Sequence, residues 1–546
     1  MPTYNISSAV ANLRFQMRQT AQGGAVFVKN AVVAYRLTSS AFNEITDIDY
    51  PSRHTYSCST LTHSPTLSTA TYSIQASTIG HSLIVGNSVV IWGAAQAAYN
   101  VTTVVSTVPN ISTFTYTITS SPTTPATITT NIFARGGKTT VPGAVYLNDV
   151  MYVQDINGPI QNSNEGDISS WNALAFITPE REPSNPVVLA KSLNYVVSFK
   201  EWDTEFFYDA GTAAPASPLS RIEAAYLKMG CAAADSVVEF DGGVIFMSKR
   251  EQLQRSREIH VLDGLTPKKI STPEVERLLN ADNLSTVFAC YLSAAGHQLY
   301  ALTLRSISTT PVYDFNNGFW YEWSTLSTAQ STQISAGNLI SDGMVATATV
   351  STHGYSDGDP VLVSSVSQAV YNGIFNIRRL TVSTFSYNLS SFTTVTTATS
   401  SATIMSVAGY TETYFPAVAY ASYQNLDLVL HETNGIIYSI DPDVFQDNGN
   451  PINLHVRLSP WDGGNNQHKI ISRLRIIGDR VASSSLIRYS DNDLSTYSLY
   501  EPMDMSKESA QLPRAGSTRR RVYEIRHTEN TAFRAESLEQ EAKQGK

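Results

Sequence analysis

The stretch Ala144-Val145-Tyr146-Leu147-Asn148-Asp149-Val150-Met151-Tyr152-Val153 decides the fold class of this 546-residue chain. Two short apolar and aromatic runs flank Asn148-Asp149, a pair that favours a tight turn, and this order is typical of a β-hairpin. The same order returns at 237–247, 288–302, 312–323 and 426–440, each time with glycine in the turn. Hairpins spread over 144–440 with little helix between them predict an all-β chain.

The composition favours the same class. Charged residues make up only 15% of the chain, and its abundant Ser, Thr, Tyr and Val favour strands and turns over charged surface helices. One helix is expected at 271–279, where Thr272 can cap the first turn and Pro273 fits the first helical position. Because the hairpins would build small antiparallel sheets, the pattern suits a β-propeller, with a β-sandwich as the alternative.

Two stretches that are poor in charge and rich in Ser and Thr, roughly 68–132 and 336–407, repeat each other. Their matching positions lie 272 residues apart, with a one-residue slip near the end. The matching residues are His81 and His353, Gly86 and Gly358, Val89 and Val361, Tyr99-Asn100 and Tyr371-Asn372, and Phe114-Thr115-Tyr116 and Phe385-Ser386-Tyr387. Both stretches alternate apolar and polar residues, which predicts two small β-barrels or sandwiches inserted in the body.

These patterns divide the chain into five parts. We expect an N-terminal segment that joins the body (1–67), a first inserted β module (68–132), a β-propeller body (133–335), a second inserted β module (336–407), and a part that completes the propeller and ends the chain (408–546). A chain of this length is expected to hold about two to four domains and to bury a large core.

The charge balance bears on contact with nucleic acid. The net charge of −9 and the pI near 5.6 argue against a protein whose task is to grip DNA, because phosphate binding needs clustered Lys and Arg. An acidic wall also suits a channel through which DNA slides, although ordinary acidic solubility explains the same charge. Arg514 and the run Arg519-Arg520-Arg521 form the one basic cluster. It predicts a solvated edge or, alternatively, docking to an acidic neighbour or contact with DNA phosphate.

The cysteines and the amino terminus indicate the cellular compartment in which the protein is made. Cys58, Cys231 and Cys290 are too few and too widely spaced for a disulfide framework or a zinc knuckle, so buried free thiols are expected. The sequence from Met1 shows no signal-peptide pattern, and no window supplies about twenty uncharged apolar residues. We therefore expect a soluble protein made in a cytoplasm.

One motif resembles that of a nucleophilic serine. Gly354-Tyr355-Ser356-Asp357-Gly358 fits the GxSxG pattern, which needs a strand-to-helix elbow together with a downstream acid and histidine. The motif lies in the second β-rich module, and the first module has Gly80-His81-Ser82-Leu83-Ile84-Val85-Gly86 at the same place. We interpret it as a turn.

A second motif resembles a calcium loop. Asp441, Asp443, Asp447 and Gly449 are spaced roughly as such a loop requires, but Phe445 and Gln446 stand where it needs an oxygen ligand and a glycine. We interpret these carboxylates as turn caps. The chain also has no HExxH and no GxxxxGK, and no arrangement of Cys and His indicates a thiol–imidazole nucleophile. No catalytic, cofactor-binding or metal-binding residue is assigned, and no cofactor is expected.

A glycosidase remains the alternative class, because the two carboxylates of such an enzyme leave no fixed spacing in sequence and propellers host such enzymes. Trp202, Asp203 and Glu205 are the residues that would line a sugar-binding cleft. A strand with core aromatics is the competing interpretation of the same residues, and it is the one we favour.

Several segments occur in an order that resembles one family. They are the stretch 143–153, Ser169-Ser170-Trp171-Asn172-Ala173-Leu174, Glu205-Phe206-Phe207-Tyr208-Asp209-Ala210-Gly211, Pro218-Leu219-Ser220-Arg221, Gly230-Cys231-Ala232-Ala233, Gly264-Leu265-Thr266-Pro267-Lys268-Lys269-Ile270-Ser271-Thr272, Tyr321-Glu322-Trp323-Ser324, and Tyr489-Ser490-Asp491-Asn492-Asp493 with the arginine-rich stretch to Tyr523. As an ordered set they resemble the packaged-DNA stabilisation, or tail hub and nozzle, proteins of short-tailed bacteriophages. The resemblance covers about 135–330 and resumes after 408.

The resemblance implies a propeller-like body in a homo-oligomeric ring, expected to be a hexamer, below the portal and its adaptor or head-to-tail connector ring. Such a ring retains packaged DNA and later lets it pass without sequence preference. A tail needle, a tail fibre or tailspike, and the host envelope are the further partners it implies. We expect a structural, non-enzymatic part of the virion tail that is assembled in the host cytoplasm. The alternative is a propeller-type tail protein that binds or cleaves host surface glycans.

Overall fold

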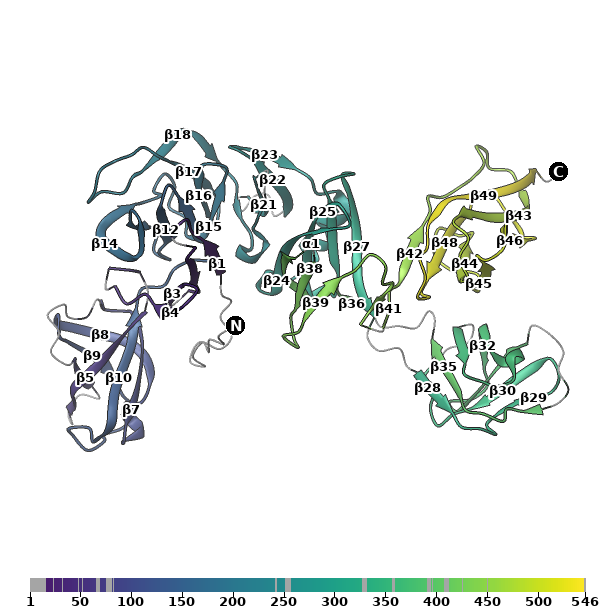
Figure 1. The fold of residues 1–546 in the computed structure, drawn as a ribbon, viewed down its shortest axis with the longest axis horizontal. Coiled ribbons are helices and arrows are strands. Elements are labelled where there is room, and N and C mark those ends of the chain that lie inside the picture. Colours follow the sequence, from purple (N-terminus) through teal and green to yellow (C-terminus); the bar gives the residue numbers. More distant parts are fainter. Residues whose placement is uncertain are drawn as a thin grey trace. The chain divides into compact units, whose positions relative to one another are not determined.

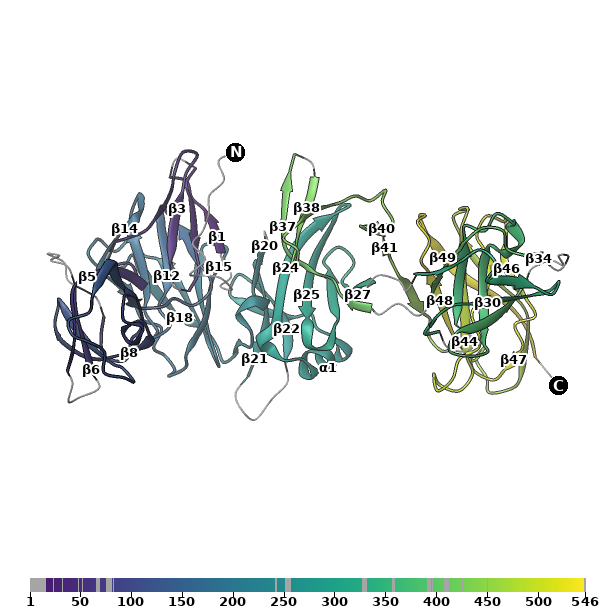
Figure 2. The same cartoon turned by 90° about the horizontal axis from the view of Figure 1, so that it is seen from below.

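The computed structural model describes residues 16–544 apart from short gaps at 23, 32, 48, 52, 65–68, 75–80, 82, 241–242, 251–256, 327–330, 356–358, 390–393, 395, 407–411, 425 and 449. Strands form most of the described structure (Figure 1, Figure 2), which confirms the predicted all-β class. The chain divides into two compact units, residues 1–289 and 290–546.

The first unit contains four antiparallel sheets whose neighbouring strands are nearly all consecutive in the chain, as in the blades of a propeller. They consist of β1 (Gln16–Gln19), β2 (Val26–Lys29), β3 (Ala34–Leu37) and β4 (Phe42–Glu44); β11 (Val145–Leu147), β12 (Val150–Gln154), β13 (Ile160–Asn164) and β14 (Asp167–Ile177); β15 (Pro186–Ser192), β16 (Tyr195–Lys200), β17 (Thr204–Asp209) and β18 (Leu219–Leu227); and β19 (Gly230–Cys231), β20 (Val238–Phe240), β21 (Gly243–Lys249), β22 (Glu258–Asp263) and β23 (Thr266–Lys269). Early strands of successive sheets contact each other, β1 with β11, β11 with β15, and β15 with β20.

The hairpin that opens the second sheet forms as its sequence predicts. Asn148 and Asp149 have φ values of 48° and 61°, which place both in the left-handed region that a two-residue hairpin turn requires. The Tyr146 hydroxyl donates a hydrogen bond to Asp149 Oδ1 at 2.7 Å. Leu147 and Val150 pair across the turn.

Apolar side chains on both faces of β12 hold neighbouring sheets together. Met151 packs with Phe27 of the first sheet, whereas Tyr152 packs with Phe207 of the third, and all four side chains are fully buried. Burial on two faces explains why this strand is a continuous apolar run rather than an alternating one. The predicted helix is also present as α1 (Pro273–Ala281), with the Thr272 side chain accepting a hydrogen bond from Val275 N.

The first inserted module is a closed barrel with the strand order β10-β5-β6-β9-β8-β7. Its strands are β5 (Arg53–Ser64), β6 (Thr69–Ile74), β7 (Ser88–Ala94), β8 (Thr102–Asn110), β9 (Thr113–Thr117) and β10 (Ile128–Gly137). The barrel extends beyond the expected range of 68–132 at both ends, because it includes β5, which lies entirely before that range, and the last residues of β10.

Two further meander sheets follow α1. They consist of β24 (Val287–Ala294), β25 (His297–Leu304), β26 (Thr310–Asp314), β27 (Phe319–Leu326) and β36 (Glu412–Tyr414), and of β37 (Ala417–Tyr423), β38 (Leu426–His431) and β39 (Ile437–Ile440). Strands β27 and β36 pair from Ser324 with Tyr414 to Leu326 with Glu412, although the second module lies between them in the sequence. The second module is thus inserted within one sheet.

The second module repeats the first at the level of individual contacts. Its strands are β28 (Ser331–Ile334), β29 (Leu339–Ser341), β30 (Val345–Thr349), β31 (Pro360–Ser364), β32 (Gly373–Arg379), β33 (Thr384–Asn388), β34 (Thr396–Thr397) and β35 (Ala402–Ser406). In the first module, Asn100 Oδ1 accepts a hydrogen bond from Ala94 N at 3.0 Å, and Asn100 Nδ2 donates one to Ala94 O at 2.8 Å. In the second module, Asn372 Oδ1 likewise accepts a hydrogen bond from Val366 N at 3.1 Å, and Asn372 Nδ2 donates one to Val366 O at 2.8 Å.

The two modules also share a tyrosine contact. The Tyr116 hydroxyl donates to Tyr99 O at 3.1 Å, and the Tyr387 hydroxyl donates to Tyr371 O at 3.3 Å. His81 and His353 are both buried against aromatic rings, Phe114 and Phe385 respectively. The matching Asn and Tyr residues therefore make the same hydrogen bonds in both modules, and the matching His residues pack against equivalent rings.

Residues 454–544 form two sheets whose strand order is not consecutive, unlike the meander sheets. The strands are β42 (Leu454–Arg457), β43 (Lys469–Gly478), β44 (Ser484–Ser490), β45 (Glu501–Asp504), β46 (Ala510–Pro513), β47 (Ser517–Thr518), β48 (Val522–His527) and β49 (Ala535–Gln544). They share a core that includes Leu474, Ile487 and Tyr523. The short pair β40 (Gln446–Asp447) and β41 (Asn450–Pro451) precedes them.

Candidate functional site

The early strands of the four sheets in the first unit line a common cavity of about 330 Å³. Its wall includes Arg18 of β1, Ala144 next to β11, Leu189 of β15 and Glu239 of β20. This central junction, as we call the cavity and the residues around it, is where the sheets of the propeller body are joined in the first unit.

An ion pair ties the junction together. Arg18 Nη2 lies 2.6 Å from Glu239 Oε1, and Arg18 Nε donates to Ala144 O at 3.0 Å. Glu239 Oε1 also accepts a hydrogen bond from the backbone N–H of Lys191 at 2.8 Å. Two side chains thus connect β1, β11, β15 and β20, so their contribution is to hold four sheets in one arrangement.

Gly143 allows two segments of backbone to meet at this junction. Its φ of +92° is in the region that favours glycine, and a Cβ there would lie 1.7 Å from Leu189 O. Its N–H donates to Gln16 Oε1 at 2.5 Å, and its carbonyl accepts a hydrogen bond from Lys29 Nζ at 3.2 Å. No side chain larger than hydrogen fits this position without moving the third sheet.

Lys29 is a fully buried cation beside the junction. Its Nζ donates to Val141 O at 2.7 Å and to Gly143 O at 3.2 Å. Burial lowers the pKa of Lys29 from 10.5 to about 7, because the charged form loses its hydration. In the unfolded chain the same amine keeps its ordinary pKa and stays protonated up to about pH 10.

The pKa of Lys29 leads to a testable pH dependence. Between the folded and unfolded pKa values the unfolded state binds the extra proton, so the contribution of Lys29 to stability rises with pH. We expect the unfolding free energy of the wild type, minus that of Lys29→Met, to rise by about 1.4 kcal/mol per pH unit between pH 7.5 and 9.5. Urea unfolding of both proteins at several pH values measures this difference. The cysteine thiols also ionise in this pH range, but they contribute equally to both proteins and cancel in the difference. Parallel pH profiles would contradict the expectation.

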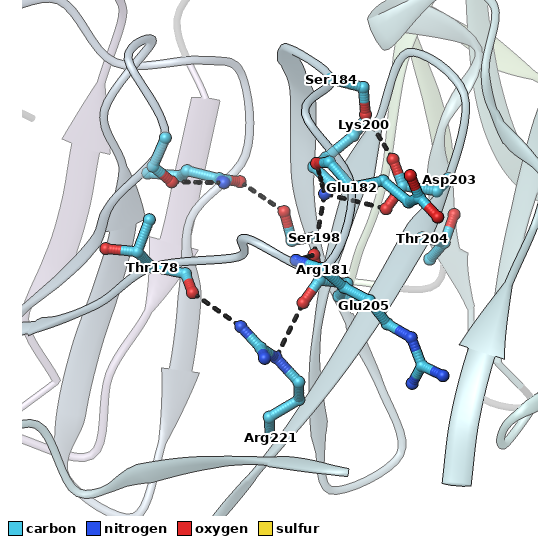
Figure 3. Close-up of polar contacts among 12 residues, drawn as sticks. Thr178, Arg181, Glu182, Ser184, Ser198, Lys200, Asp203, Thr204, Glu205 and Arg221 are labelled. Atoms are coloured by element: carbon cyan, nitrogen blue, oxygen red, sulfur yellow. Dashed lines mark hydrogen bonds and ion pairs between the residues drawn. The ribbon is translucent and has the colours of Figure 1, made fainter. Parts of the chain in front are cut away.

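A second polar network lies in the third sheet (Figure 3), and its Lys200, Asp203 and Glu205 side chains are buried. Lys200 Nζ lies 2.8 Å from Asp203 Oδ2 and 2.8 Å from Glu205 Oε1. Arg221 Nε lies 2.8 Å from Glu205 Oε2, and Arg221 Nη2 donates to Thr178 O at 3.0 Å. Two carboxylates and two cations balance one another, and Arg221 links β17 and β18 to the segment that follows β14.

The same network shows what the candidate sugar-cleaving residues do in the fold. The side chains of Asp203 and Glu205 are 2% and 1% exposed, and both bind the single Lys200 ammonium. The Trp202 ring instead contacts Lys249, whose Nζ lies 3.9 Å from the ring centroid. The structure therefore brings the two carboxylates together as parts of an ion-pair network within a sheet, and not as walls of an open cleft.

The other motifs lie as follows. Ser356 and Gly449 are outside the described residues. Asp441 Oδ1 accepts a hydrogen bond from Asp443 N at 3.0 Å, which is the turn-capping contact that we expected. Asp447 Oδ2 accepts from the Thr325 hydroxyl at 3.3 Å. In the described part of the chain, no three His, Cys, Asp or Glu side chains are grouped as a metal site requires.

The basic cluster near the carboxyl end is divided between the core and the surface. Arg521 is 1% exposed, its guanidinium pairs with Asp491 at 2.7 Å and 2.8 Å, and it stacks on Tyr489 with 3.6 Å to the ring centroid. Arg520 pairs with Asp493 at 3.0 Å, whereas Arg514 is exposed. Arg521 is thus a core residue, which the run of three arginines in the sequence gave no reason to expect.

The cysteines are free thiols, as predicted. Cys231 and Cys290 are buried, whereas Cys58 is half-buried. Burial raises the pKa of Cys231 to about 12 and that of Cys58 to about 11, so both thiols are poor nucleophiles. Over the described ranges, no helix has the length and apolar character needed to cross a bilayer.

Comparison with solved structures gives matches of low similarity. The designed protein Ika8 is 11% identical, with 78% of this chain and 94% of that chain covered and a TM-score of 0.26. The dihydro-heme d1 dehydrogenase NirN is 10% identical, with 80% and 75% covered and a TM-score of 0.27. The endosialidase of phage phi92 is 12% identical, with 80% and 65% covered and a TM-score of 0.16. At these TM-scores the likenesses carry no argument about function.

A family model gives the informative match. No curated protein matches the chain, but residues 143–340 match the model described as "Bacteriophage P22 Gp10, beta-propeller". The match begins at the glycine of the central junction and covers the sheets from β11 to β27. Residues 143–340 are thus similar to the phage DNA-stabilisation and tail-hub family, a family of β-propeller proteins.

Proposed function

We propose that this chain is a subunit of the hub or nozzle ring of a short-tailed phage, below the portal and its adaptor. In this position the ring retains packaged DNA and later forms the channel for its ejection. The observation that carries the proposal is the match of residues 143–340 to a family of phage tail structural proteins.

The contacts at the central junction support this role. A ring that holds back packaged DNA needs subunits whose sheets do not separate under load. The Arg18–Glu239 pair joins four strands from four sheets, and Arg221 joins the second and third sheets. Partly or fully buried ion pairs of this kind specify one arrangement of the elements that they connect.

The proposed role requires no catalysis. Asp203 and Glu205, which the sequence offered as an alternative carboxylate pair, form ion pairs with Lys200 and Arg221. A net charge of −9 also suits a channel wall, because like charge keeps DNA from adhering as it passes. We propose that the ring is a hexamer bound to the adaptor, with a needle and a fibre or tailspike as further partners, and that it is assembled in the host cytoplasm.

Deletion of the gene tests the proposal. Particles that lack the protein are expected to fill with DNA, to lose the distal tail in electron micrographs, and to release their genome into a nuclease-sensitive form. Expression of the wild-type chain from a plasmid is expected to restore tails and DNA retention together. Complete tails that keep their DNA without the protein would overturn the proposal and favour the glycan-active alternative.

A further inference from the structure

The outer surface of the first module carries two aromatic side chains next to each other. Trp92 of β7 and Phe133 of β10 are cross-strand partners, and their ring centroids lie 5.6 Å apart with an interplanar angle of 29°. Trp92 is 39% exposed and Phe133 is half-buried. The two rings thus form an apolar platform that is open to solvent in the isolated chain.

The second module is an internal control for this pair. The equivalent strands β31 and β35 place Ser364 opposite Thr403 where the first module has Trp92 opposite Phe133. The residues one step along, Ile91 and Ala134 in the first module and Val363 and Ile404 in the second, are buried in both. Because β31 and β35 of the second module pair in the equivalent register with Ser and Thr at these positions, this strand pairing does not need the aromatic pair.

The surroundings of the platform are polar and contain few charged side chains. Residues 54–134 contain no Asp, Glu, Lys or Arg, so nearly the whole first module lacks charged side chains. Ser57 lies opposite Phe133 on the other neighbouring strand, β5. Arg135 lies two residues after Phe133 on β10, and its side chain is paired with Glu44 at 2.9 Å.

These features match the chemistry of one ligand class. Aromatic rings offer a flat, electron-rich face to the polarised C–H groups of a sugar ring, and hydroxyl side chains beside them bond the sugar hydroxyls. A surface without unpaired charge gives no attraction to phosphate, sulfate or sialic acid. An apolar protein surface would also fit two aromatic rings, but it would not require polar neighbours such as Ser57 or a setting with so few charged side chains.

We propose that Trp92 and Phe133 form a stacking platform for a neutral sugar ring, so that the first module binds an uncharged glycan. This goes beyond the ring's role in DNA retention and does not depend on it. The second module, with Ser364 and Thr403 in the equivalent places, lacks the platform. The two modules thus have one fold and different surfaces.

The test converts the platform into the surface of the second module. The double variant Trp92→Ser with Phe133→Thr introduces the residues that the equivalent strand pair of the second module already holds, so its thermal unfolding is expected to match that of the wild type. Val104→Ser is the matched control, because Val104 is 54% exposed on the same barrel, on β8. The full-length proteins are titrated with dextran, mannan, galactan and polysialic acid, and binding is followed by tryptophan fluorescence and by calorimetry.

We expect the wild type and Val104→Ser to bind at least one neutral polysaccharide and not polysialic acid. The double variant is expected to bind about tenfold more weakly or not at all. Three results would overturn the proposal: no binding of any neutral polysaccharide by the wild type, equal binding by the double variant, or a change in oligomeric state in the double variant with unchanged sugar binding. The last result would identify the platform as a contact between copies of the chain.

Discussion

Gly143→Ala is expected to prevent stable folding of the first unit. The new Cβ would lie 1.7 Å from Leu189 O, and the backbone there has a φ of +92° that alanine rarely adopts. Because the overlap is with backbone, no rotamer change relieves it, and the third sheet or the Gly143 segment has to move. We expect a loss of more than about 4 kcal/mol in the unfolding free energy of this unit, which combines overpacking with backbone strain.

Gly166→Ala is the matched control for this prediction. Gly166 lies in the turn between β13 and β14 with a φ of +75°, but a Cβ there meets no atom within 4 Å. It therefore has the backbone strain without the overlap, and we expect a loss of about 1 kcal/mol. Soluble yield and urea unfolding compare the two variants, with limited proteolysis to assign the transition of the first unit. Equal losses in unfolding free energy for the two substitutions would show that the close approach to Leu189 O is not what destabilises Gly143→Ala.

Lys200→Met is the second substitution with a large expected effect. It leaves Asp203 and Glu205 buried with one cation fewer, and their side chains are only 2% and 1% exposed. Removing one partner of a buried ion pair typically costs about 3–5 kcal/mol, because the remaining charge is left without compensation. We expect a loss of this size in the urea unfolding of the first unit.

Lys507→Met serves as the control for Lys200→Met. Lys507 pairs with Asp504 at 3.4 Å, but its side chain is 71% exposed, and an exposed pair contributes about 0–1 kcal/mol. A further check is the variant Glu205→Gln, which keeps the shape of the side chain and removes its charge from the network. A loss below about 1 kcal/mol for Lys200→Met would contradict the view that this network holds the third sheet in place.

The features that were predicted correctly are local in the sequence. The Asn148-Asp149 turn, the capping of α1 by Thr272, and the pairing of Leu147 with Val150 depend on residues that lie within a few positions of one another. The repeat was also visible, because a match of Tyr99-Asn100 with Tyr371-Asn372 needs no knowledge of the fold. Local turn chemistry and internal similarity are what a single sequence carries most directly.

The central junction was missed because its contacts are remote in sequence. Arg18 and Glu239 are 221 positions apart, and Gly143 meets Leu189 from another sheet. A glycine after a proline, as in Pro142-Gly143, looks like an ordinary turn, and only the structure shows the close approach that requires it. The one signal in the sequence was that Gly143 opens the first of the segments that resemble the tail-hub family.

Charge in the sequence left the role of two groups of residues open. A carboxylate pair for chemistry was the alternative interpretation of Asp203 and Glu205, and a strand with core aromatics was the favoured one; in the fold, Lys200 and Arg221 neutralise both carboxylates. Arg521 looked like part of a basic surface run, but it is buried against Tyr489. Sequence order shows which charges are close along the chain, whereas burial and pairing are decided by which strands come together.

Cryo-electron microscopy of intact particles tests the central claim most directly. The account predicts a ring of this chain below the adaptor, on the axis of the DNA channel, with density that fits the sheets of the first unit and both inserted modules. Density for the chain only in peripheral fibres, or its absence from purified particles, would contradict the account.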